Sequence, residues 1–294
     1  MISENSSCKT WREYEEAVYE ECERVFHFKG AEIIKNTQIV GHISGSKRQI
    51  DVLVKLHQRD DTICSIVVEC KQYAKKIDIK TIDSFIGFLK DVEAQRGILV
   101  SDKGFTKGAI ARAHKGEDDI EVDILNLGEL KQFQAYGAIV YSGENALAIA
   151  PPFGWIIDGQ QRGFAPAVFY RRGITFAEAT EKEKEWMYLQ FWAKKSIKDT
   201  LENLITTQNK SLKAMDNRAV IRLSEVDGLK VREAYLPSYP VPEVTVFREY
   251  DRFIAFIVLF CPDSFVKRDV RKIIDAFLDA IPIIVKKGKE NQFE

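Results

Sequence analysis

This 294-residue sequence lacks paired cysteines at metal-binding spacing, long apolar runs and an excess of charge of either sign. Its five cysteines are odd in number and none of them forms a CxxC pair, which argues against a disulfide framework or a structural zinc site. No apolar run is long enough for a membrane span, and the start MISENSSCKTWREYEE has no signal-peptide core. We therefore expect a cytoplasmic protein with no membrane partner.

The charge is balanced, with 43 Lys and Arg against 44 Asp and Glu. The first 130 residues are net acidic and the remainder is net basic, so neither part is a broadly basic nucleic-acid binder. Contacts with nucleic acid would have to come from local clusters. Hydrophobic residues make up 45% of the chain, which is ample for a packed core.

The first part of the chain alternates helical and strand patterns. Apolar spacing predicts the following elements in order: a helix at 10–26, strands at 36–40, 49–56 and 63–71, a helix at 79–93, a strand at 97–101, a helix at 105–115 and a strand at 120–125. The order αβββαβαβ indicates an α/β layer arrangement with a mixed sheet flanked by helices.

The second part predicts an α+β sandwich with a mainly antiparallel sheet. We place the linker near 128–145 and the domains at 1–135 and 140–294. The patterns predict strands within 146–158, 165–172 and 185–195, a helix around 197–210, a hairpin at 243–260 and a closing helix at 263–280. Both faces of WMYLQFWAKK are apolar, which predicts a central strand covered on both sides.

Charged residues interrupt two apolar strands of the first part. Because strand side chains alternate between faces, Glu69 and Lys71 share one face at the end of their strand. In the preceding strand, Ile50 and Val52 share the core side and Asp51 lies opposite. Charges buried at such positions are costly unless they pair with each other or hold a metal ion.

A third carboxylate comes from the first helix. On a helical wheel Glu15 falls inside the apolar stripe, whereas Glu16 falls outside it. Glu15, Asp51, Glu69 and Lys71 are thus expected to converge. Carboxylates suit Mg²⁺, which retains several waters, and a nearby lysine can assist an attacking water or stabilise phosphoryl charge. This set fits metal-assisted hydrolysis of phosphodiester bonds.

The segments QID51, VVE69CK71QY, GILVSDKGFTKGAIARAH and IEVDIL occur in this order within residues 10–126. Together they resemble the restriction endonuclease-like superfamily with the PD-(D/E)xK motif, in its Mrr-like branch. Members of that branch open with a helix bearing an aromatic–Glu pair, matched here by Tyr14 and Glu15. The proline that names the motif is replaced by Ile50.

The resemblance implies a DNA endonuclease that uses Mg²⁺, for which Mn²⁺ can substitute. Asp51, Glu69 and Glu15 would hold the metal, Lys71 would assist the water, and Gln72 would orient a ligand or the substrate. Double-stranded DNA is the expected substrate. Sequence-independent backbone contacts are expected from Lys47, Arg48, Lys75, Lys76, Lys80, Lys103 and Lys107.

The run PPFGWIIDGQQRGFAPAVFYRRG in the second part faintly resembles the Mog1/PsbP-like α/β sandwich. The domain is expected to regulate or recruit, with a protein or small molecule as trigger, and the chain to form homo-oligomers. By analogy of fold, the whole suits restriction or anti-phage defence. The alternatives are a nuclease-fold protein that binds nucleic acid without cutting it, and a regulatory protein whose second domain carries the function.

Overall fold

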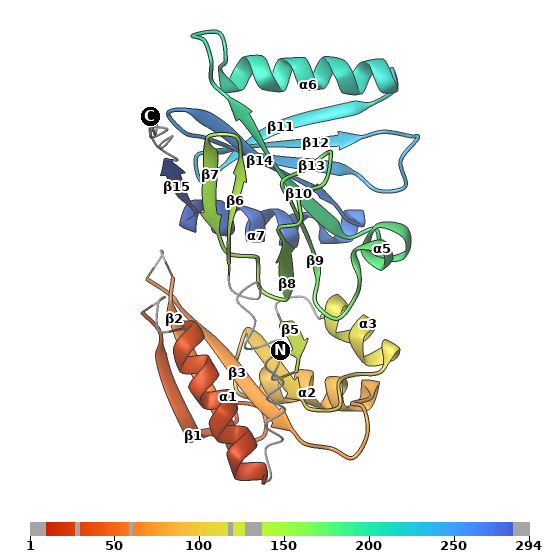
Figure 1. Ribbon diagram of the computed structural model, residues 1–294. Coiled ribbons are helices and arrows are strands. Elements are labelled where there is room, and N and C mark those ends of the chain that lie inside the picture. Colours follow the sequence, from red (N-terminus) through yellow and green to blue (C-terminus); the bar gives the residue numbers. More distant parts are fainter. Residues whose placement is uncertain (1–9, 27–29, 59–60, 117–119, 127–136, 285–294) are drawn as a thin grey trace, which may run out of the picture. The chain divides into compact units, whose positions relative to one another are not determined.

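The computed structural model describes residues 10–26, 30–58, 61–116, 120–126 and 137–284. The chain divides into two compact units, Met1–Ala135 and Tyr136–Glu294, which are described separately below (Figure 1). No helix within these described segments is both long and apolar enough to span a membrane.

The N-terminal unit is built on a five-stranded sheet in the order β1-β2-β3-β4-β5. Its elements are α1 (Trp11–Phe26), β1 (Glu32–Val40), β2 (Lys47–His57), β3 (Ile63–Lys71), α2 (Ile79–Asp91), β4 (Arg96–Ser101), α3 (Lys107–Lys115) and β5 (Glu121–Leu125). The first three strands pair antiparallel, and β3, β4 and β5 pair parallel. Parallel neighbours need crossover connections, which α2 and α3 provide. The predicted order αβββαβαβ and mixed sheet are confirmed.

Helices cover this sheet on both faces. In β2 the three consecutive residues Val52, Leu53 and Val54 are all buried, as expected for a strand with no solvent face. Leu53 and Val67 pack with α2 and α3 in one hydrophobic cluster. Ile50 also belongs to that cluster, and Ile50 and Val52 are both buried. Helix α1 lies against β1, β2 and β3 (Figure 1).

The loop between β1 and β2 is held by a buried carboxylate at the end of α2. Asp91 is 6% exposed and accepts hydrogen bonds from the backbone N–H groups of Ile43 and Ser44, at 3.0 and 2.8 Å. The Ser44 hydroxyl donates to its second oxygen at 2.8 Å, and the Arg48 guanidinium lies 3.4 Å away. Ser44 and Ile43 thereby hold the pKa of Asp91 below its usual value. The loop is therefore a fixed element.

Replacing Asp91 by Ala should lower the free energy of unfolding by about 2 to 3 kcal/mol, because two backbone N–H groups and Arg48 lose a charged acceptor at once. Chemical denaturation of the two proteins at pH 7 measures this. Asp83→Ala is the matched control, since Asp83 is an exposed carboxylate of the same helix that pairs with Arg112 at the surface. Equal losses for both variants would contradict the anchoring role.

The C-terminal unit contains a seven-stranded antiparallel sheet in the order β11-β12-β13-β14-β10-β9-β8 and a three-stranded sheet in the order β15-β7-β6. The strands of the large sheet are β8 (Trp155–Asp158), β9 (Ala167–Arg171), β10 (Trp186–Ala193), β11 (Val220–Val226), β12 (Leu229–Tyr235), β13 (Glu243–Glu249) and β14 (Phe253–Phe260). The small sheet consists of β6 (Ala138–Ser142), β7 (Asn145–Ile149) and β15 (Ile281–Ile284). The helical segments are α5 (Phe176–Glu178), η3 (Ala179–Glu183), α6 (Leu201–Met215), η4 (Asp263–Phe265) and α7 (Val266–Asp279).

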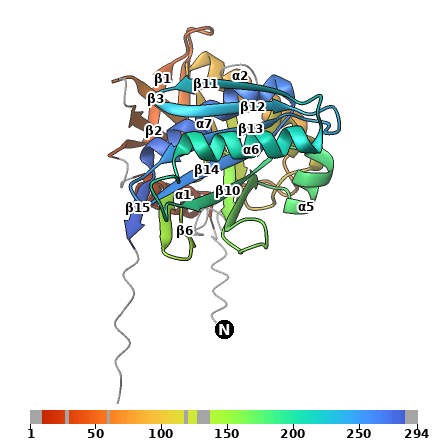
Figure 2. The same cartoon turned by 90° about the horizontal axis from the view of Figure 1, so that it is seen from above.

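Two long helices lie on opposite faces of the large sheet. The apolar face of α7 packs with Met187, Leu189 and the small sheet in the main hydrophobic core. Leu204 and Ile205 of α6 pack on Phe256 of β14 on the other face, where α6 crosses the sheet (Figure 2). The predicted α+β class with a mainly antiparallel sheet is confirmed.

Several boundaries predicted for this unit are wrong. The expected linker at 128–145 contains β6, which pairs with β7, while residues 127–136 lie outside the described residues. The helix expected around 197–210 begins at Leu201 and ends at Met215. The hairpin formed by β11 and β12 was not predicted at all. Strand β10 is central within the sheet, but Trp192 is 40% exposed, so its second face is not fully covered.

A buried ionic cluster joins α7 to the β9–β10 region. Arg268 donates to both oxygens of Asp269 at 2.8 and 2.9 Å and to Glu185 at 2.8 Å. Lys272 lies 3.5 Å from Asp269, and Arg171 lies 4.0 Å from Glu185. Burial raises the pKa of Glu185 despite these cations. Such clusters cost desolvation energy, and removal of one partner is strongly destabilising.

Candidate active site

The pairing of β2 with β3 places Asp51 beside Glu69. Val52 pairs with Val68, and Asp51 and Glu69 each lie one residue further toward the same end of the sheet. There the Asp51 carboxylate accepts a hydrogen bond from the backbone N–H of Cys70 at 2.8 Å. This hydrogen bond fixes the orientation of the Asp51 side chain against β3.

Glu69 and Lys71 lie on one face of β3, as predicted from the alternation of strand side chains. The Lys71 Nζ donates to Glu69 Oε2 at 2.8 Å. The side chain of Lys71 is 28% exposed and that of Glu69 is 12% exposed, so the pair is partly shielded from water. Strand β3 pairs with β2 on one side and with β4 on the other, which makes this ion pair part of the rigid centre of the sheet.

The electrostatic surroundings of Glu69 are mixed. Burial raises its pKa, the Lys71 ammonium opposes this, and the Asp51 carboxylate raises it further. Arg48, which also contacts Asp91, acts to lower it. The result is a carboxyl group whose pKa lies above its usual value. A cation placed between Asp51 and Glu69 would relieve their repulsion.

Lys71 is held in its charged form. Burial lowers its pKa, but Glu69, Tyr73 and Asp51 together outweigh burial, and the net shift is upward. An ammonium with a raised pKa is a poor general base at neutral pH. It can instead donate hydrogen bonds and stabilise negative charge that develops on a phosphoryl group.

Glu15 lies at the edge of the buried stripe of α1. The stripe is centred on Tyr14, Val18 and Cys22, all nearly inaccessible to solvent, whereas Glu15 is half-buried. On the helical wheel Glu15 falls between the buried Cys22 and Phe26, so the predicted contrast with the exposed Glu16 is confirmed, although Glu15 is only half-buried. Burial raises its pKa, and the charge of Asp51 raises it further. Its neighbour Glu16 is exposed and pairs with Lys35.

The carboxylates do not form a ready-made three-ligand cage. Across the described part of the chain, no three His, Cys, Asp or Glu side chains are grouped closely enough to hold a metal ion. Asp51 is nevertheless the common neighbour of Glu69 and Glu15, since its charge raises the pKa of both. Oxygen donors of this kind suit Mg²⁺, which proteins often bind through one or two carboxylates plus water and substrate phosphate.

The seven cations expected to contact phosphate fall into two groups, six exposed lysines and the half-buried Arg48. Lys47, Lys75, Lys76, Lys80, Lys103 and Lys107 are all exposed. The loops after β3 and β4 are joined, because Ile77 bridges Phe105 and its N–H donates to the Gly104 carbonyl at 3.0 Å. This join brings together the loops that carry Lys75, Lys76 and Lys103, beyond the carboxyl ends of β3 and β4. Gln72 is exposed and follows the last residue of β3.

Arg48 takes a structural position. It approaches Asp91 at 3.4 Å and stacks over the ring of Phe88 at 4.8 Å. Neither contact was predicted, because the sequence gives no sign that the end of α2 meets the β1–β2 loop.

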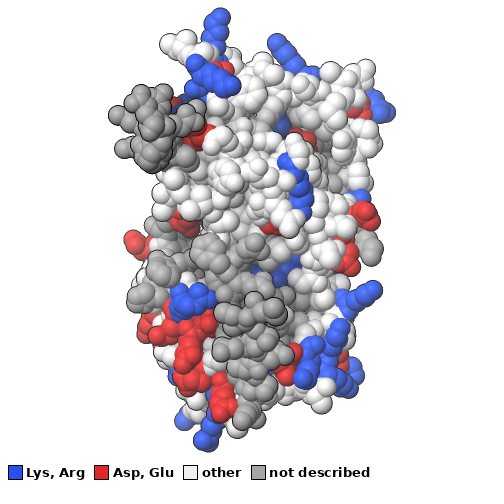
Figure 3. All heavy atoms as spheres, in the orientation of Figure 1, with Lys and Arg blue, Asp and Glu red and all other residues white. Residues whose placement is uncertain are grey.

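Charge is unevenly distributed over this unit. Figure 3 shows acidic side chains gathered over α1 and basic side chains on the side of α2 and α3. The exposed acids of α1 are Glu13, Glu16, Glu20 and Glu23. The net acidity of the first 130 residues thus comes largely from the outer face of one helix, and the lysine-bearing loops form a locally basic surface.

A mixed sheet that aligns Asp51 with an ExK strand, with helices on both faces, defines a restriction endonuclease-like nuclease fold. Residues 10–133 match the Mrr_cat family model, described as a restriction endonuclease. This match agrees with the Mrr-type resemblance that the sequence motifs carry, and it supports a nuclease.

Two solved structures show similarity to parts of the chain. The cyanobacterial PsbP protein (CyanoP) from Synechocystis sp. PCC 6803 matches with 12% identity and a TM-score of 0.34, covering 52% of this chain and 95% of that one. The MspJI restriction endonuclease in complex with a 27-mer oligonucleotide matches with 16% identity and a TM-score of 0.30. That match covers 40% of this chain and 26% of the MspJI chain. No curated protein matches the sequence.

Proposed function

We propose that the N-terminal unit hydrolyses DNA phosphodiester bonds in a reaction that requires Mg²⁺, with Mn²⁺ as a substitute. The observation that carries this proposal is the alignment of Asp51 with the Glu69–Lys71 pair, in which Asp51 binds the Cys70 N–H and Lys71 binds Glu69. Asp51 and Glu69 would hold the ion, and Glu15 would complete the acidic side of the site. A bound divalent ion polarises the phosphate and lowers the pKa of an attacking water.

The residues of the chain have separate roles in this proposal. Glu69 holds the Lys71 ammonium in place at 2.8 Å. Lys71 stabilises the negative charge that develops on the phosphate during attack and orients the water. Gln72 contacts the substrate next to Lys71. The exposed lysines of the joined loops beyond β3 and β4 bind the phosphate backbone of double-stranded DNA without reading its sequence.

The C-terminal unit is proposed to regulate or recruit this activity, and the whole protein to act in restriction or anti-phage defence. The defence role rests on analogy of fold.

The direct test is digestion of supercoiled plasmid by the full chain with Mg²⁺, Mn²⁺ or excess EDTA. Cleavage is expected with either metal and should be undetectable in EDTA, because removal of the divalent ion takes away the group that polarises the phosphate and activates the attacking water. Cleavage that persists in EDTA would refute metal dependence. If no condition gives cleavage while a gel shift shows DNA binding, the unit is a binding protein with a nuclease fold.

A further inference from the structure

Strand β11 forms one edge of the large sheet of the C-terminal unit. It pairs with β12 from Val220 opposite Tyr235 to Val226 opposite Leu229, and the described strands place no neighbour on its other side. Most of its side chains are exposed, among them Val220 and Leu223 at 51% and 54%. An edge of this kind presents backbone N–H and C=O groups to an incoming strand.

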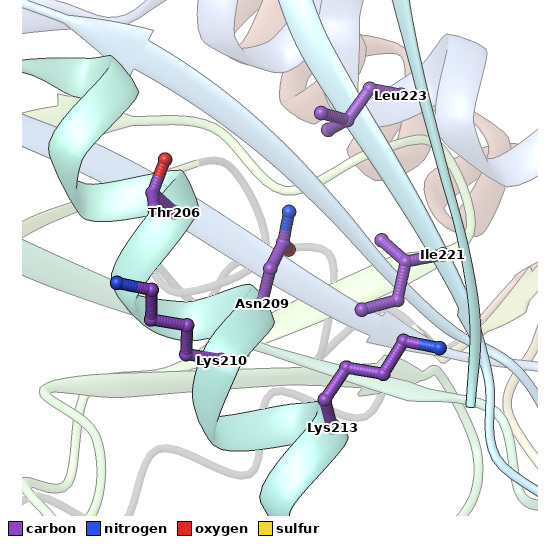
Figure 4. A pocket seen from close by; sticks show the side chains of 6 residues that line it. All are labelled: Thr206, Asn209, Lys210, Lys213, Ile221 and Leu223. Carbon is purple, nitrogen blue, oxygen red and sulfur yellow. The ribbon is translucent and has the colours of Figure 1, made fainter. Parts of the chain in front are cut away.

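A groove runs between this edge strand and helix α6. Thr206, Asn209, Lys210 and Lys213 line it from one stripe of the helix, and Ile221 and Leu223 line it from the strand. In Figure 4 the two apolar side chains point from β11 toward α6, while Asn209 and Lys213 reach from the helix toward the strand. An extended segment paired with β11 would project alternate side chains into this groove.

The strand wall of the groove is apolar and the helix wall is polar with two lysines, of which Lys213 reaches toward β11 and Lys210 extends away from it in Figure 4. No carboxylate is among its lining residues, and two of the six are lysines. Lys213 donates to the Ala219 carbonyl, which keeps its ammonium near the start of β11. At the same end, Met215 is 62% exposed and extends the apolar surface beyond the groove. Acidic groups alternating with apolar ones would match both walls.

We propose that the α6–β11 groove binds an extended acidic segment of a partner protein, which adds to the sheet as a strand beside β11. Backbone hydrogen bonds to β11 supply affinity, apolar side chains pack on Ile221 and Leu223, and carboxylates meet Lys210 and Lys213. The apolar lining, without an aromatic ring for base stacking, favours a peptide over nucleic acid. Pairing with a second copy of this chain would bring two positive grooves together and is disfavoured by charge.

The test uses two degenerate octapeptide pools on the full chain. In the acidic pool, valine, isoleucine or leucine alternates with glutamate or aspartate; in the basic pool, lysine or arginine replaces the acids. Capture on immobilised protein is measured by mass spectrometry. We expect capture of the acidic pool to exceed that of the basic pool at least tenfold. Equal capture of both pools, or capture of neither, would overturn the proposal.

Charge-reversal variants locate the binding site. The double variant Lys210→Glu with Lys213→Glu should reduce capture of the acidic pool at least tenfold, and Lys210→Glu alone severalfold. Lys210→Glu leaves the Lys213–Ala219 contact intact, so it remains informative if the double variant folds poorly. The control is Lys195→Glu with Lys267→Glu, two exposed lysines elsewhere in the unit, which should retain capture within twofold.

Two further outcomes identify other occupants and would overturn the acidic-segment proposal. One is single-stranded oligonucleotide binding that exceeds acidic-pool binding and is lost in Lys210→Glu. The other is a dimer in analytical ultracentrifugation that the same variant dissociates. Backbone chemical shifts that change in β11 and α6 on addition of the acidic pool, and that do not change in the double variant, would support the proposal directly.

Discussion

Asp51→Asn should reduce metal-dependent DNA cleavage by on the order of 10³-fold, because loss of a charged ligand removes several kcal/mol of electrostatic stabilisation from the transition state. The asparagine keeps an oxygen that can accept the Cys70 N–H, which Asp51 binds at 2.8 Å, so the fold should be preserved. Initial rates of plasmid nicking at saturating Mg²⁺ measure the effect.

The matched control is Asp102→Asn, which removes a carboxylate that follows β4 and pairs with Lys103 at the surface. We expect its cleavage rate to stay within about twofold of that of the wild type, since exposed ion pairs contribute little. Wild-type activity in Asp51→Asn would remove Asp51 from the metal site. Unchanged circular dichroism and melting temperature are required before the rate is interpreted.

Lys71→Met should lower the cleavage rate by about 10²- to 10³-fold, because it removes a cation that stabilises phosphoryl charge while keeping a side chain of similar length. The pKa of Glu69 should rise further, since Lys71 opposes the effects of burial and of Asp51 on that carboxyl. Because a protonated Glu69 holds a metal ion poorly, the variant should lose more activity on the acidic side of its pH–rate profile than on the alkaline side. Single-turnover rates between pH 6 and 9 test both expectations.

Lys76→Met serves as the control, because Lys76 is exposed in the loop after β3. It should weaken DNA binding slightly and leave the single-turnover rate unchanged. Lys71→Met, by contrast, should retain DNA binding in a gel shift. If Lys71→Met cleaves at the wild-type rate, the catalytic role of this lysine is wrong, whatever the outcome for Asp51.

The sequence predicts the N-terminal unit well because its local signals agree with its tertiary structure. Strand β3 is an apolar run bounded by turns, and its predicted limits of 63 and 71 match the structure. The shared face of Glu69 and Lys71 follows from strand alternation alone and is confirmed by their contact. The helical wheel likewise separates the half-buried Glu15 from the exposed Glu16, but it does not show how deeply Glu15 is buried, because that depends on how α1 packs on the sheet.

Other features depend on contacts that a sequence pattern does not encode. The link from Arg48 to Asp91 joins residues of β2 and α2 that are far apart in the chain. The β11–β12 hairpin was overlooked because an exposed edge strand has a weak apolar pattern. The sequence does contain one signal for this hairpin, the dipeptide Asp227-Gly228, which is typical of two-residue hairpin turns. In the structure both residues have the positive φ that such a turn requires.

The hydrogen bond from the Cys70 N–H to Asp51 gives the site an internal reporter. An amide proton bound to a carboxylate exchanges with solvent deuterium only when that contact opens. Because Cys70 is fully buried, its exchange rate depends on the integrity of the β2–β3 edge and on whether the Asp51 side chain keeps this contact. The deuterium uptake of a single backbone amide can thus follow the occupancy of the acidic site without any catalytic turnover.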